Sequence, residues 1–391
     1  MSRNGMSALL ACVPHRRDAV IPWDRLESTP LGVLLRQMAQ TEQNPEYHGE
    51  GDVLTHTRLV CEALVSDEAY FAMAETDQTV LFLAALLHDI GKIRCTVLRD
   101  GALVSPRHSI IGSQMARELL WRDFGLCGSP ERQMLREAVC LLIRYHSYPP
   151  FAMRDADSER RLLRMAANGE LTPAFSLKKL CMLERADVIG RISADADDSL
   201  ARIEYCALSA DELGILDRPF SFSSDYSKRS YFRGKTDWRE ASLFCDTWGE
   251  VMLLSGLPGT GKDTWIAQKA PDMPVVSLDE IRTRLRISPT EPQGAVIAAA
   301  HEQAREYLRR HEPFIWNATS ISTRLRDRQI SLFESYGASV RTLFLETEWE
   351  EELRRNASRQ AYVPQAVIER MLGGLELPER YESERVEWAI T

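Results

Sequence analysis

The sequence predicts a multidomain protein in which an all-α helical bundle is followed by an α/β domain with a parallel sheet. A chain of 391 residues is too long for one ordinary core. Up to about residue 205 apolar residues recur at helical spacing, whereas from residue 249 short apolar runs alternate with helical segments. We therefore expect a first domain at 1–212, a connector at 213–248 and a second domain at 249–391.

The composition is that of a globular protein, with 44% hydrophobic and 27% charged residues. No apolar run approaches the roughly 18 residues that a membrane span needs, and the N-terminal apolar stretch is too short for a secretory signal. We expect a cytoplasmic protein with no membrane partner. The net charge of −9 disfavours nucleic-acid binding by bulk electrostatics, although 282–286 and 354–359 are locally basic.

Eight cysteines lie at or before Cys245, without a CxxC pair or a regular spacing. This usage favours reduced and mostly buried thiols over disulfides or a structural zinc site.

Within the first domain, apolar residues follow a helical period in 59–64, 80–87 and 135–143. Residues 97–104 contain Arg99-Asp100-Gly101 and predict a short hairpin or a loop. The connector is rich in Ser, Arg and aromatic residues and lacks helical periodicity, so we expect it to be partly packed.

In the second domain, strand-like runs at 251–255, 274–277, 313–316 and 340–345 alternate with helical segments, notably 293–310 and 323–336. This alternation predicts a parallel sheet covered by helices on both faces.

A glycine-rich loop, GLPGTGKDT, follows the first strand and precedes a helix, which is the context of a phosphate-binding P-loop. Its glycines allow backbone N–H groups to turn inward around phosphate oxygens, and the lysine supplies a cation. Asp263 stands where a Ser or Thr usually ligates Mg²⁺, and Thr264 follows. The predicted ATP (or other NTP) and Mg²⁺ contacts are Gly256, Gly259, Thr260, Gly261, Lys262, Asp263 and Thr264.

Imidazoles and carboxylates on separate helices of the first domain predict a transition-metal site in the bundle core. The adjacent pair His88-Asp89 ends a hydrophobic run, where burying both side chains is costly unless metal or hydrogen bonds compensate them. The candidate ligands are His56, His88, Asp89, His108, His146 and Asp187. His48, Glu50 and Arg191 are weaker candidates, and His15, His301 and His311 have no partner pattern.

This order resembles the HD phosphohydrolase superfamily, whose pattern H…HD…H…H…D has HDIGK at its centre. The resemblance implies that Asp89 bridges two metals, with Mn²⁺, Ni²⁺ or Co²⁺ as examples, and that a water between them attacks phosphorus. Lys92 is expected to contact the substrate phosphate.

Further polar residues follow the P-loop where open α/β sheets place their active residues. Asp279 can accept the proton of an attacking hydroxyl, and Arg282 can hold a phosphate of the acceptor. Asn317 and Thr319 end the third strand and are expected to face the same cleft. Arg355 and Arg359 lie four residues apart, and we expect them on one helix face as a lid over the transferring phosphate.

This half, over roughly 250–380, resembles the 5′-hydroxyl polynucleotide kinases, including the phage end-healing kinase. The likeness rests on D-x-x-R at Asp279 and Arg282 and on a lid pattern at Arg355, Asn356, Arg359, Val363 and Pro364. It implies that Asp279 is the general base, that Arg282 holds the 3′-phosphate beside the acceptor 5′-OH, and that Arg359 stabilises the donor phosphates. Many relatives carry Asp where Asn317 stands.

Together the halves resemble the bacterial HD-Pnk end-healing enzymes, an all-α HD-domain bundle followed by an α/β P-loop kinase. The resemblance implies removal of 2′,3′-cyclic phosphate or 2′/3′-phosphate ends, phosphorylation of 5′-OH ends of RNA or DNA, and a polynucleotide ligase as functional partner. Three alternatives stay open, namely an HD nucleotide phosphohydrolase fused to a small-molecule kinase, a non-catalytic nucleotide-sensing regulator, and an RNA-binding module. No aromatic-basic platform supports the last.

Overall fold

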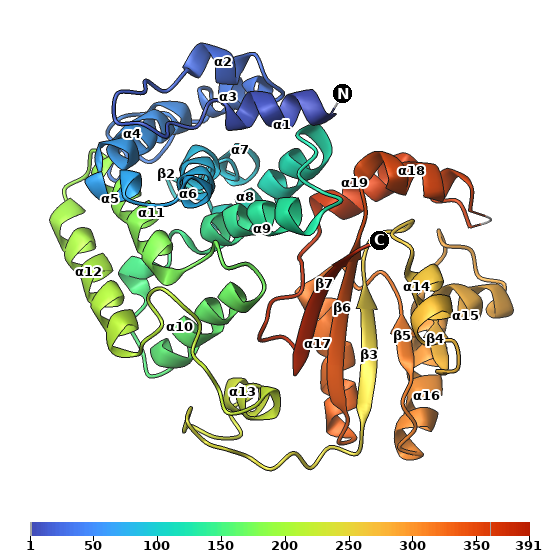
Figure 1. The fold of residues 1–391 in the computed structure, drawn as a ribbon. Helices are drawn as coiled ribbons and strands as arrows, with labels where there is room; N and C mark the ends of the chain where they lie inside the picture. Colours follow the sequence, from blue (N-terminus) through green and yellow to red (C-terminus); the bar gives the residue numbers. More distant parts are fainter. Residues whose placement is uncertain (1, 360) are drawn as a thin grey trace. The chain divides into compact units, whose positions relative to one another are not determined.

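The computed structural model describes residues 2–359 and 361–391, which form two compact units that divide between Phe220 and Ser221 (Figure 1). The predicted multidomain fold, helices followed by a parallel sheet, is confirmed. The segment 213–248, expected to connect the domains, is shared between the units, with 221–248 belonging to the second.

The first unit is built from helices and one small hairpin. Its α-helices are α1 (Ser2–Leu10), α2 (Trp23–Glu27), α3 (Gly32–Met38), α4 (Val53–Ser66), α5 (Glu68–Phe71), α6 (Glu75–Leu87), α7 (Lys92–Cys95), α8 (His108–Glu118), α9 (Pro130–Tyr145), α10 (Ser158–Ala167), α11 (Leu177–Ile189) and α12 (Ala196–Glu212). A π-helix, η1 (Leu119–Asp123), extends α8, and η2 (Pro149–Phe151) and η3 (Asn168–Glu170) are short 3₁₀ turns. Strands β1 (Val97–Arg99) and β2 (Ala102–Val104) pair antiparallel, which confirms the hairpin.

Helix α6 is the centre of this unit because its second half is apolar on every side. All residues from Gln78 to Leu87 are buried, and α6 packs against α4, α9 and α11. A helix that is hydrophobic all round has to be enclosed by its neighbours. The polar residues that follow Leu87 therefore emerge where these helices meet.

The second unit contains a parallel sheet of five strands in the order β4-β5-β3-β6-β7 (Figure 1). The strands are β3 (Glu250–Ser255), β4 (Val275–Ser277), β5 (Ile315–Asn317), β6 (Ser339–Glu346) and β7 (Arg385–Ile390). The helices are α13 (Asp225–Phe232), α14 (Lys262–Lys269), α15 (Leu278–Leu285), α16 (Gly294–Arg309), α17 (Thr323–Ser335), α18 (Trp349–Ala357) and α19 (Gln365–Gly373).

The central strand β3 sends alternate side chains into two hydrophobic clusters. Val251 and Leu253 pack with residues of α16 and α17, whereas Met252 and Leu254 pack with residues of α14. Side chains of a strand alternate between the faces of its sheet. Helices therefore cover both faces, as the sequence predicted, and the loop after β3 opens from the middle of the sheet.

Strand β7 and helix α13 are among the elements of the second unit that the sequence analysis did not predict. Strand β7 mixes charged and apolar residues, as an edge strand paired only on one side can. Helix α13 lies inside the segment that lacks helical periodicity. It begins at a Ser224 cap, and its Arg229 pairs with Glu334 of α17 at 2.6 Å, so tertiary contacts stabilise a helix that its sequence pattern does not indicate.

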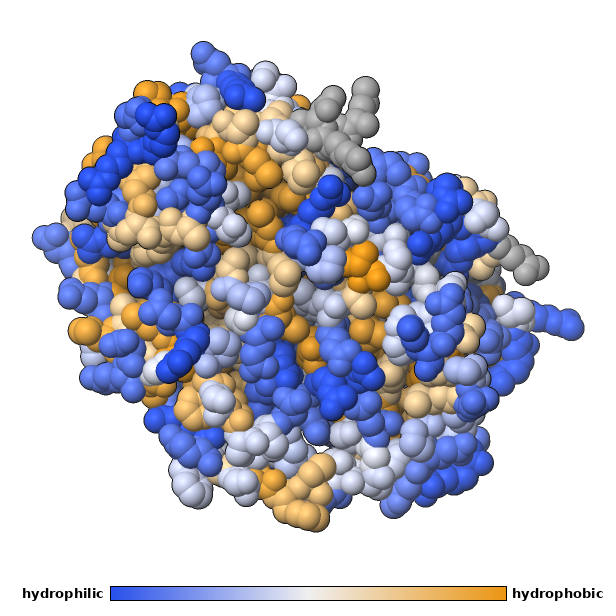
Figure 2. Space-filling model, viewed as in Figure 1, coloured by the Kyte–Doolittle hydropathy of each residue, from blue (hydrophilic) through white to orange (hydrophobic). Residues whose placement is uncertain are grey.

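The face in Figure 2 carries hydrophilic residues over most of its area, with hydrophobic residues in smaller groups. Among the helices of the described residues, none has both the length and the apolar character that crossing a membrane requires. Seven of the eight cysteines are buried and Cys245 is exposed, which confirms the expectation of mostly buried thiols.

Candidate functional site

The candidate metal ligands come from five places in the first unit that converge at the end of α6. His56 lies on α4, His88 and Asp89 follow α6, His108 begins α8, His146 follows α9, and Asp187 lies on α11. Gly91 allows the loop after Asp89 to lie against the start of α8, because a Cβ at Gly91 would be 2.1 Å from the carbonyl oxygen of His108. The structure brings all six side chains together.

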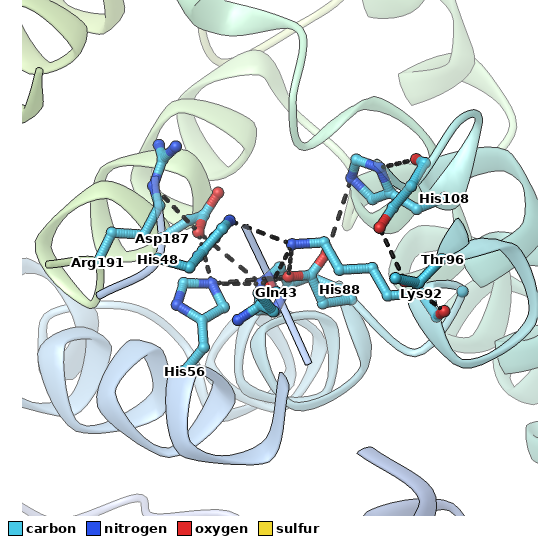
Figure 3. A network of polar contacts seen from close by, with 12 residues as sticks. Gln43, His48, His56, His88, Lys92, Thr96, His108, Asp187 and Arg191 are labelled. Atoms are coloured by element: carbon cyan, nitrogen blue, oxygen red, sulfur yellow. Dashed lines mark hydrogen bonds and ion pairs between the residues drawn. The ribbon is translucent and has the colours of Figure 1, made fainter. Parts of the chain in front are cut away.

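These side chains form two triads. The first consists of His56, His88 and Asp187, and the second of Asp89, His108 and His146. In the first triad, His56 Nε2 lies 2.9 Å from Asp187 Oδ1 and 3.2 Å from His88 Nε2 (Figure 3). Asp89 faces both triads, since Oδ2 lies 3.4 Å from His88 Nε2 and Oδ1 lies 3.7 Å from His108 Nε2.

Three of the imidazoles are hydrogen-bonded through Nδ1, which leaves their Nε2 atoms available to bind a metal. His88, His108 and His146 each place Nδ1 2.7 to 3.0 Å from the backbone carbonyl oxygen three residues earlier. A carbonyl oxygen only accepts, so each Nδ1 carries the proton and each neutral ring keeps a lone pair at Nε2. This arrangement is typical of metal-ligating histidines.

The cluster fits a cation by three observations. The Nε2 atoms of His108 and His146 face each other at 3.3 Å, where two lone pairs would repel. Asp89 Oδ1 is buried and has no hydrogen-bond partner among the residues that the structure describes. The donors are imidazole nitrogens and carboxylate oxygens, a set that suits divalent transition metals.

The charges around the two triads differ, and those around the first triad favour a cation. Burial lowers the pKa of His56, but Asp187 and Glu50 outweigh it and raise that pKa to about 9. Burial, together with His108 and His88, lowers the pKa of His146 to about 3. The protein therefore stabilises a positive charge at His56 and excludes one at His146.

Lys92 lies directly beside the second triad. Its Nζ is 2.7 Å from Asp89 Oδ2 and donates to Gln43 Oε1 at 2.6 Å, and His48 Nε2 is 3.3 Å away (Figure 3). Lys92 reaches Asp89 from the first residue of α7, because the helix does not continue from His88. The sequence analysis did not find Gln43, whose amide gives no motif and lies 49 positions from Lys92.

Two weaker candidates support the first triad from behind. Glu50 Oε1 lies 2.9 Å from His56 Nδ1 and 2.9 Å from His48 Nδ1, and its pKa is held below its usual range by these contacts despite burial. Arg191 Nε lies 3.7 Å from Asp187 Oδ1. Both groups neutralise or orient a ligand rather than facing the centre of the cluster.

In the second unit, the P-loop turns sharply between β3 and α14. Gly256, Gly259 and Gly261 have φ of 148°, 94° and 79°, a region that favours glycine. Thr260 is buried and its Oγ1 donates to the carbonyl oxygen of Leu257, so its hydroxyl shapes the loop. Thr264 lies on α14 and is exposed.

Lys262 folds back onto this loop. Its Nζ donates to the carbonyl oxygens of Gly256 and Leu257, both at 2.8 Å. Burial and the positive charge of Arg359 lower the pKa of Lys262 to about 8. A phosphate group in the loop would give this buried ammonium a stronger partner than two carbonyl oxygens.

Asp279 is the meeting point of the predicted acceptor and lid arginines. Arg282 Nη1 lies 2.5 Å from Asp279 Oδ1, and Arg359 Nη2 lies 3.7 Å from Asp279 Oδ2. Arg359 Nη2 is also 4.0 Å from Asp263 Oδ2. The structure thus places the candidate base, both arginines and the P-loop aspartate around one space.

The expected lid geometry is wrong in one respect. Helix α18 ends at Ala357, so Arg359 lies beyond it and does not share a helix face with Arg355. Arg355 instead donates to Glu351 Oε1 at 2.6 Å and to Thr391 Oγ1 at 3.0 Å. Of these two arginines, Arg359 is the one that lies near Asp279, at 3.7 Å.

The two residues expected at the end of β5 contact the P-loop region differently. Asn317 Nδ2 donates to Asp263 Oδ1 at 2.7 Å. Thr319 contributes its backbone carbonyl oxygen, which accepts from the N–H of Gly256 at 3.0 Å.

Glu352 on α18 is a buried residue that the sequence analysis missed. Neither carboxylate oxygen has a hydrogen-bond partner within the described part of the chain, and burial raises the pKa to about 8. Its Cγ would lie 3.3 Å from a Cβ at Gly259, so α18 packs directly on the P-loop. Nothing in its residue type or position distinguishes it from the exposed Glu350 in the sequence.

We expect Glu352→Gln to stabilise the second unit at alkaline pH. Because the folded pKa of about 8 exceeds the unfolded value, the wild-type protein loses stability as pH rises, on the order of 3 kcal/mol between about pH 5 and pH 8. The glutamine variant lacks this loss. Thermal melting at both pH values measures it, with the exposed Glu350→Gln as control. Equal shifts in melting temperature at the two pH values would contradict a neutral Glu352.

Two family models match separate parts of the chain. Residues 53–187 match the HD domain model, and residues 251–378 match a model described as an AAA domain. Seventeen chains of solved structures match, among them a gluconokinase from Sinorhizobium meliloti 1021, with 18% identity over 37% of this chain and 83% of that chain and a TM-score of 0.28. The comparison with curated proteins finds no match. The chain carries an HD domain followed by a P-loop kinase-like domain.

Proposed function

From an HD domain joined in one chain to a P-loop kinase-like domain, we propose that this protein heals broken nucleic-acid ends. The kinase-like domain would transfer the γ-phosphate of ATP or another NTP to a 5′-OH end. The HD domain would remove a 2′,3′-cyclic phosphate or a 2′/3′-phosphate from a 3′ end. A polynucleotide ligase could then join the two products.

The observation that carries the proposal is the set of groups around Asp279. A general base has to reach the acceptor hydroxyl, and Asp279 lies on the first turn of α15, after β4. Both of its oxygens face arginines, Arg282 at 2.5 Å and Arg359 at 3.7 Å. Phosphates of the acceptor and donor would draw these guanidinium groups away and leave the carboxylate free to accept the proton.

Arg282 makes two contacts that position it for an acceptor phosphate. Its Nε donates to Gln293 Oε1 at 2.9 Å while Nη1 contacts Asp279. The Gln293 contact can keep the guanidinium in place while Nη1 turns from Asp279 to a phosphate next to the reacting hydroxyl. A polynucleotide end provides such a phosphate and a simple nucleoside lacks it. This favours a polynucleotide over a free nucleoside as acceptor.

In the HD domain the chain supplies the candidate metal ligands and, in Lys92, a cation beside them. One or two divalent transition metals, when bound by the two triads, would supply Lewis-acid activation of water and of the phosphoryl oxygen. Lys92 is buried beside Asp89 and can bind an anionic phosphate oxygen, while Gln43 holds its ammonium in place. The donor chemistry and the charge of Lys92 both suit a phosphoester substrate.

The test uses the full chain and two labelled substrates. One is an oligonucleotide with a 5′-OH end and the other carries a 2′,3′-cyclic phosphate, each assayed with Mg²⁺ and then with Mn²⁺, Ni²⁺ or Co²⁺. We expect ATP-dependent phosphorylation of the first and hydrolysis of the second. RNA and DNA versions show the preferred strand.

A competition assay separates this proposal from a small-molecule kinase. A large excess of mononucleoside should leave oligonucleotide phosphorylation nearly unchanged. Full activity on free nucleosides, with weak activity on oligonucleotides, would favour the small-molecule pair. Tight ATP binding without any turnover would favour a nucleotide-sensing regulator.

A further inference from the structure

Two departures from the usual P-loop kinase pattern meet in this structure. The residue after the P-loop lysine is ordinarily a Ser or Thr that ligates Mg²⁺, together with an acidic residue from a neighbouring strand. Here Asp263 is the residue that follows the P-loop lysine. Asn317, the last residue of β5, stands where many relatives carry the acidic residue. They are 54 positions apart, yet Asn317 Nδ2 donates to Asp263 Oδ1 at 2.7 Å.

We propose that the usual roles of these two positions are exchanged. Asp263, after the P-loop lysine, is the charged ligand of the Mg²⁺ that accompanies the nucleotide. Asn317 is then the neutral partner that holds Asp263 in position. This inference rests on the proposed kinase function and concerns how that site holds its cation. It does not depend on which acceptor the kinase phosphorylates.

The charge of the pair supports the exchange. A hydroxyl and a carboxylate carry one negative charge in the usual pair, and a carboxylate and an amide carry the same charge here. Changing only one position would leave either no carboxylate or two. Mg²⁺ takes hard oxygen ligands and usually keeps several waters, so one carboxylate next to the phosphates meets its needs.

Burial explains which position carries the charge. The side chain of Asp263 is 75% exposed, whereas Asn317 is only 9% exposed. A carboxylate at the buried end of β5 would lose hydration, but at Asp263 it keeps water and lies on the first turn of α14, where the helix dipole favours an anion. The amide at position 317 can be buried at lower cost.

The geometry leaves one oxygen of Asp263 for the cation. An ionised carboxylate only accepts, so the Asn317 amide must direct its NH₂ group toward Oδ1. Oδ2 lies 4.0 Å from Arg359 Nη2, on the side where Arg359 also approaches Asp279. Asp263 Oδ2 therefore faces the space in which the candidate base and the lid arginine meet.

The test is a reciprocal exchange at the two positions. Four proteins are compared, namely the wild type, Asp263→Ser, Asn317→Asp, and the double variant that restores the usual pair. ATP affinity is measured by calorimetry with saturating Mg²⁺ and with EDTA, and the ratio of the two affinities is the readout. Melting curves verify folding, and Asp263→Asn replaces Asp263→Ser if the serine variant does not fold.

For Asp263→Ser we expect the gain in ATP affinity from Mg²⁺ to fall about tenfold or more. The double variant should recover most of that gain, although each of its substitutions alone disturbs the site. Asp272→Asn removes an exposed carboxylate just beyond α14 and should leave the gain unchanged. The double variant has no carboxylate at position 263, on the first turn of α14. Recovery in this variant would therefore show that the carboxylate acts on the cation and does not merely stabilise the helix N-terminus.

Two results would overturn the inference while leaving the kinase in place. One is an Asp263→Ser protein that keeps the wild-type Mg²⁺ gain, and the other is a double variant no better than Asp263→Ser. Failure of the wild type to bind ATP at all would instead overturn the kinase function and this inference with it. Phosphorylation of a small molecule rather than an oligonucleotide would change the acceptor and leave the cation site standing.

Discussion

Replacing Asp279 with alanine should lower 5′-OH phosphorylation by about a thousandfold while leaving 3′-end processing intact. The reason is that Asp279 is the carboxylate between Arg282 and Arg359, and the acceptor hydroxyl would lose its proton acceptor. ATP binding should change little, because the P-loop and Lys262 do not depend on Asp279 for their hydrogen bonds. Labelled 5′-OH and cyclic-phosphate oligonucleotides, assayed on one preparation, measure both activities.

The matched control for this variant is Glu280→Gln, which removes an exposed carboxylate from the next position of α15. It should keep kinase activity within a few-fold of the wild type. Asp279→Asn adds a further check, because the amide keeps the size of the side chain and cannot act as the base. If Asp279→Ala retained a tenth of the kinase activity, or lost both activities while folded, Asp279 would not be a base serving one of two independent sites.

The metal-ligand candidates and the P-loop residues were predictable from the sequence because of their residue types and spacing. His88 and Asp89 are adjacent at the end of a hydrophobic run, and Gly256 to Lys262 have a spacing that few other loops share. Such residues can be recognised in a sequence because burying their polar groups costs free energy unless a metal or a phosphate compensates them. The parallel sheet was predictable for a related reason, since buried central strands such as β3 are short apolar runs.

Residues that act through distant contacts were not predictable. Gln43 reaches Lys92 across 49 positions, and its amide is common on any surface. Glu352 resembles the exposed Glu350 two positions earlier, and only packing of α18 on Gly259 separates them. The placement of Arg359 failed because helix ends depend on local capping, and α18 ends two residues before it.

The hydrogen bond between Asp263 and Asn317 is another contact between distant positions that the sequence did not reveal. The sequence marks each residue as a departure from a known pattern, but it does not connect them. Their relation follows from the parallel pairing of β3 with β5, which brings the end of β5 beside the start of α14. This hydrogen bond is the observation that lets the two departures from the usual pattern be tested together as one pair.

Replacing Asp89 with alanine should have the opposite effect to the Asp279 variant, removing 3′-end processing by about a thousandfold or more and sparing the kinase. Asp89 faces both triads, through Oδ2 toward His88 and Oδ1 toward His108. Its loss would leave the imidazoles of the second triad without a carboxylate and would remove the group that lies between the two triads.

Metal content provides a readout that does not depend on catalysis. After incubation with Mn²⁺ or Co²⁺ and gel filtration, elemental analysis should find less bound metal in Asp89→Ala than in the wild type. Asp100→Asn, in the exposed turn of the β1–β2 hairpin, is the control and should keep the wild-type content. Lys92→Met should keep the metal but lose phosphoester hydrolysis, because we propose that Lys92 binds the substrate phosphate and is not a metal ligand. An Asp89→Ala protein with full metal content and full 3′ processing would show that the catalytic centre lies elsewhere.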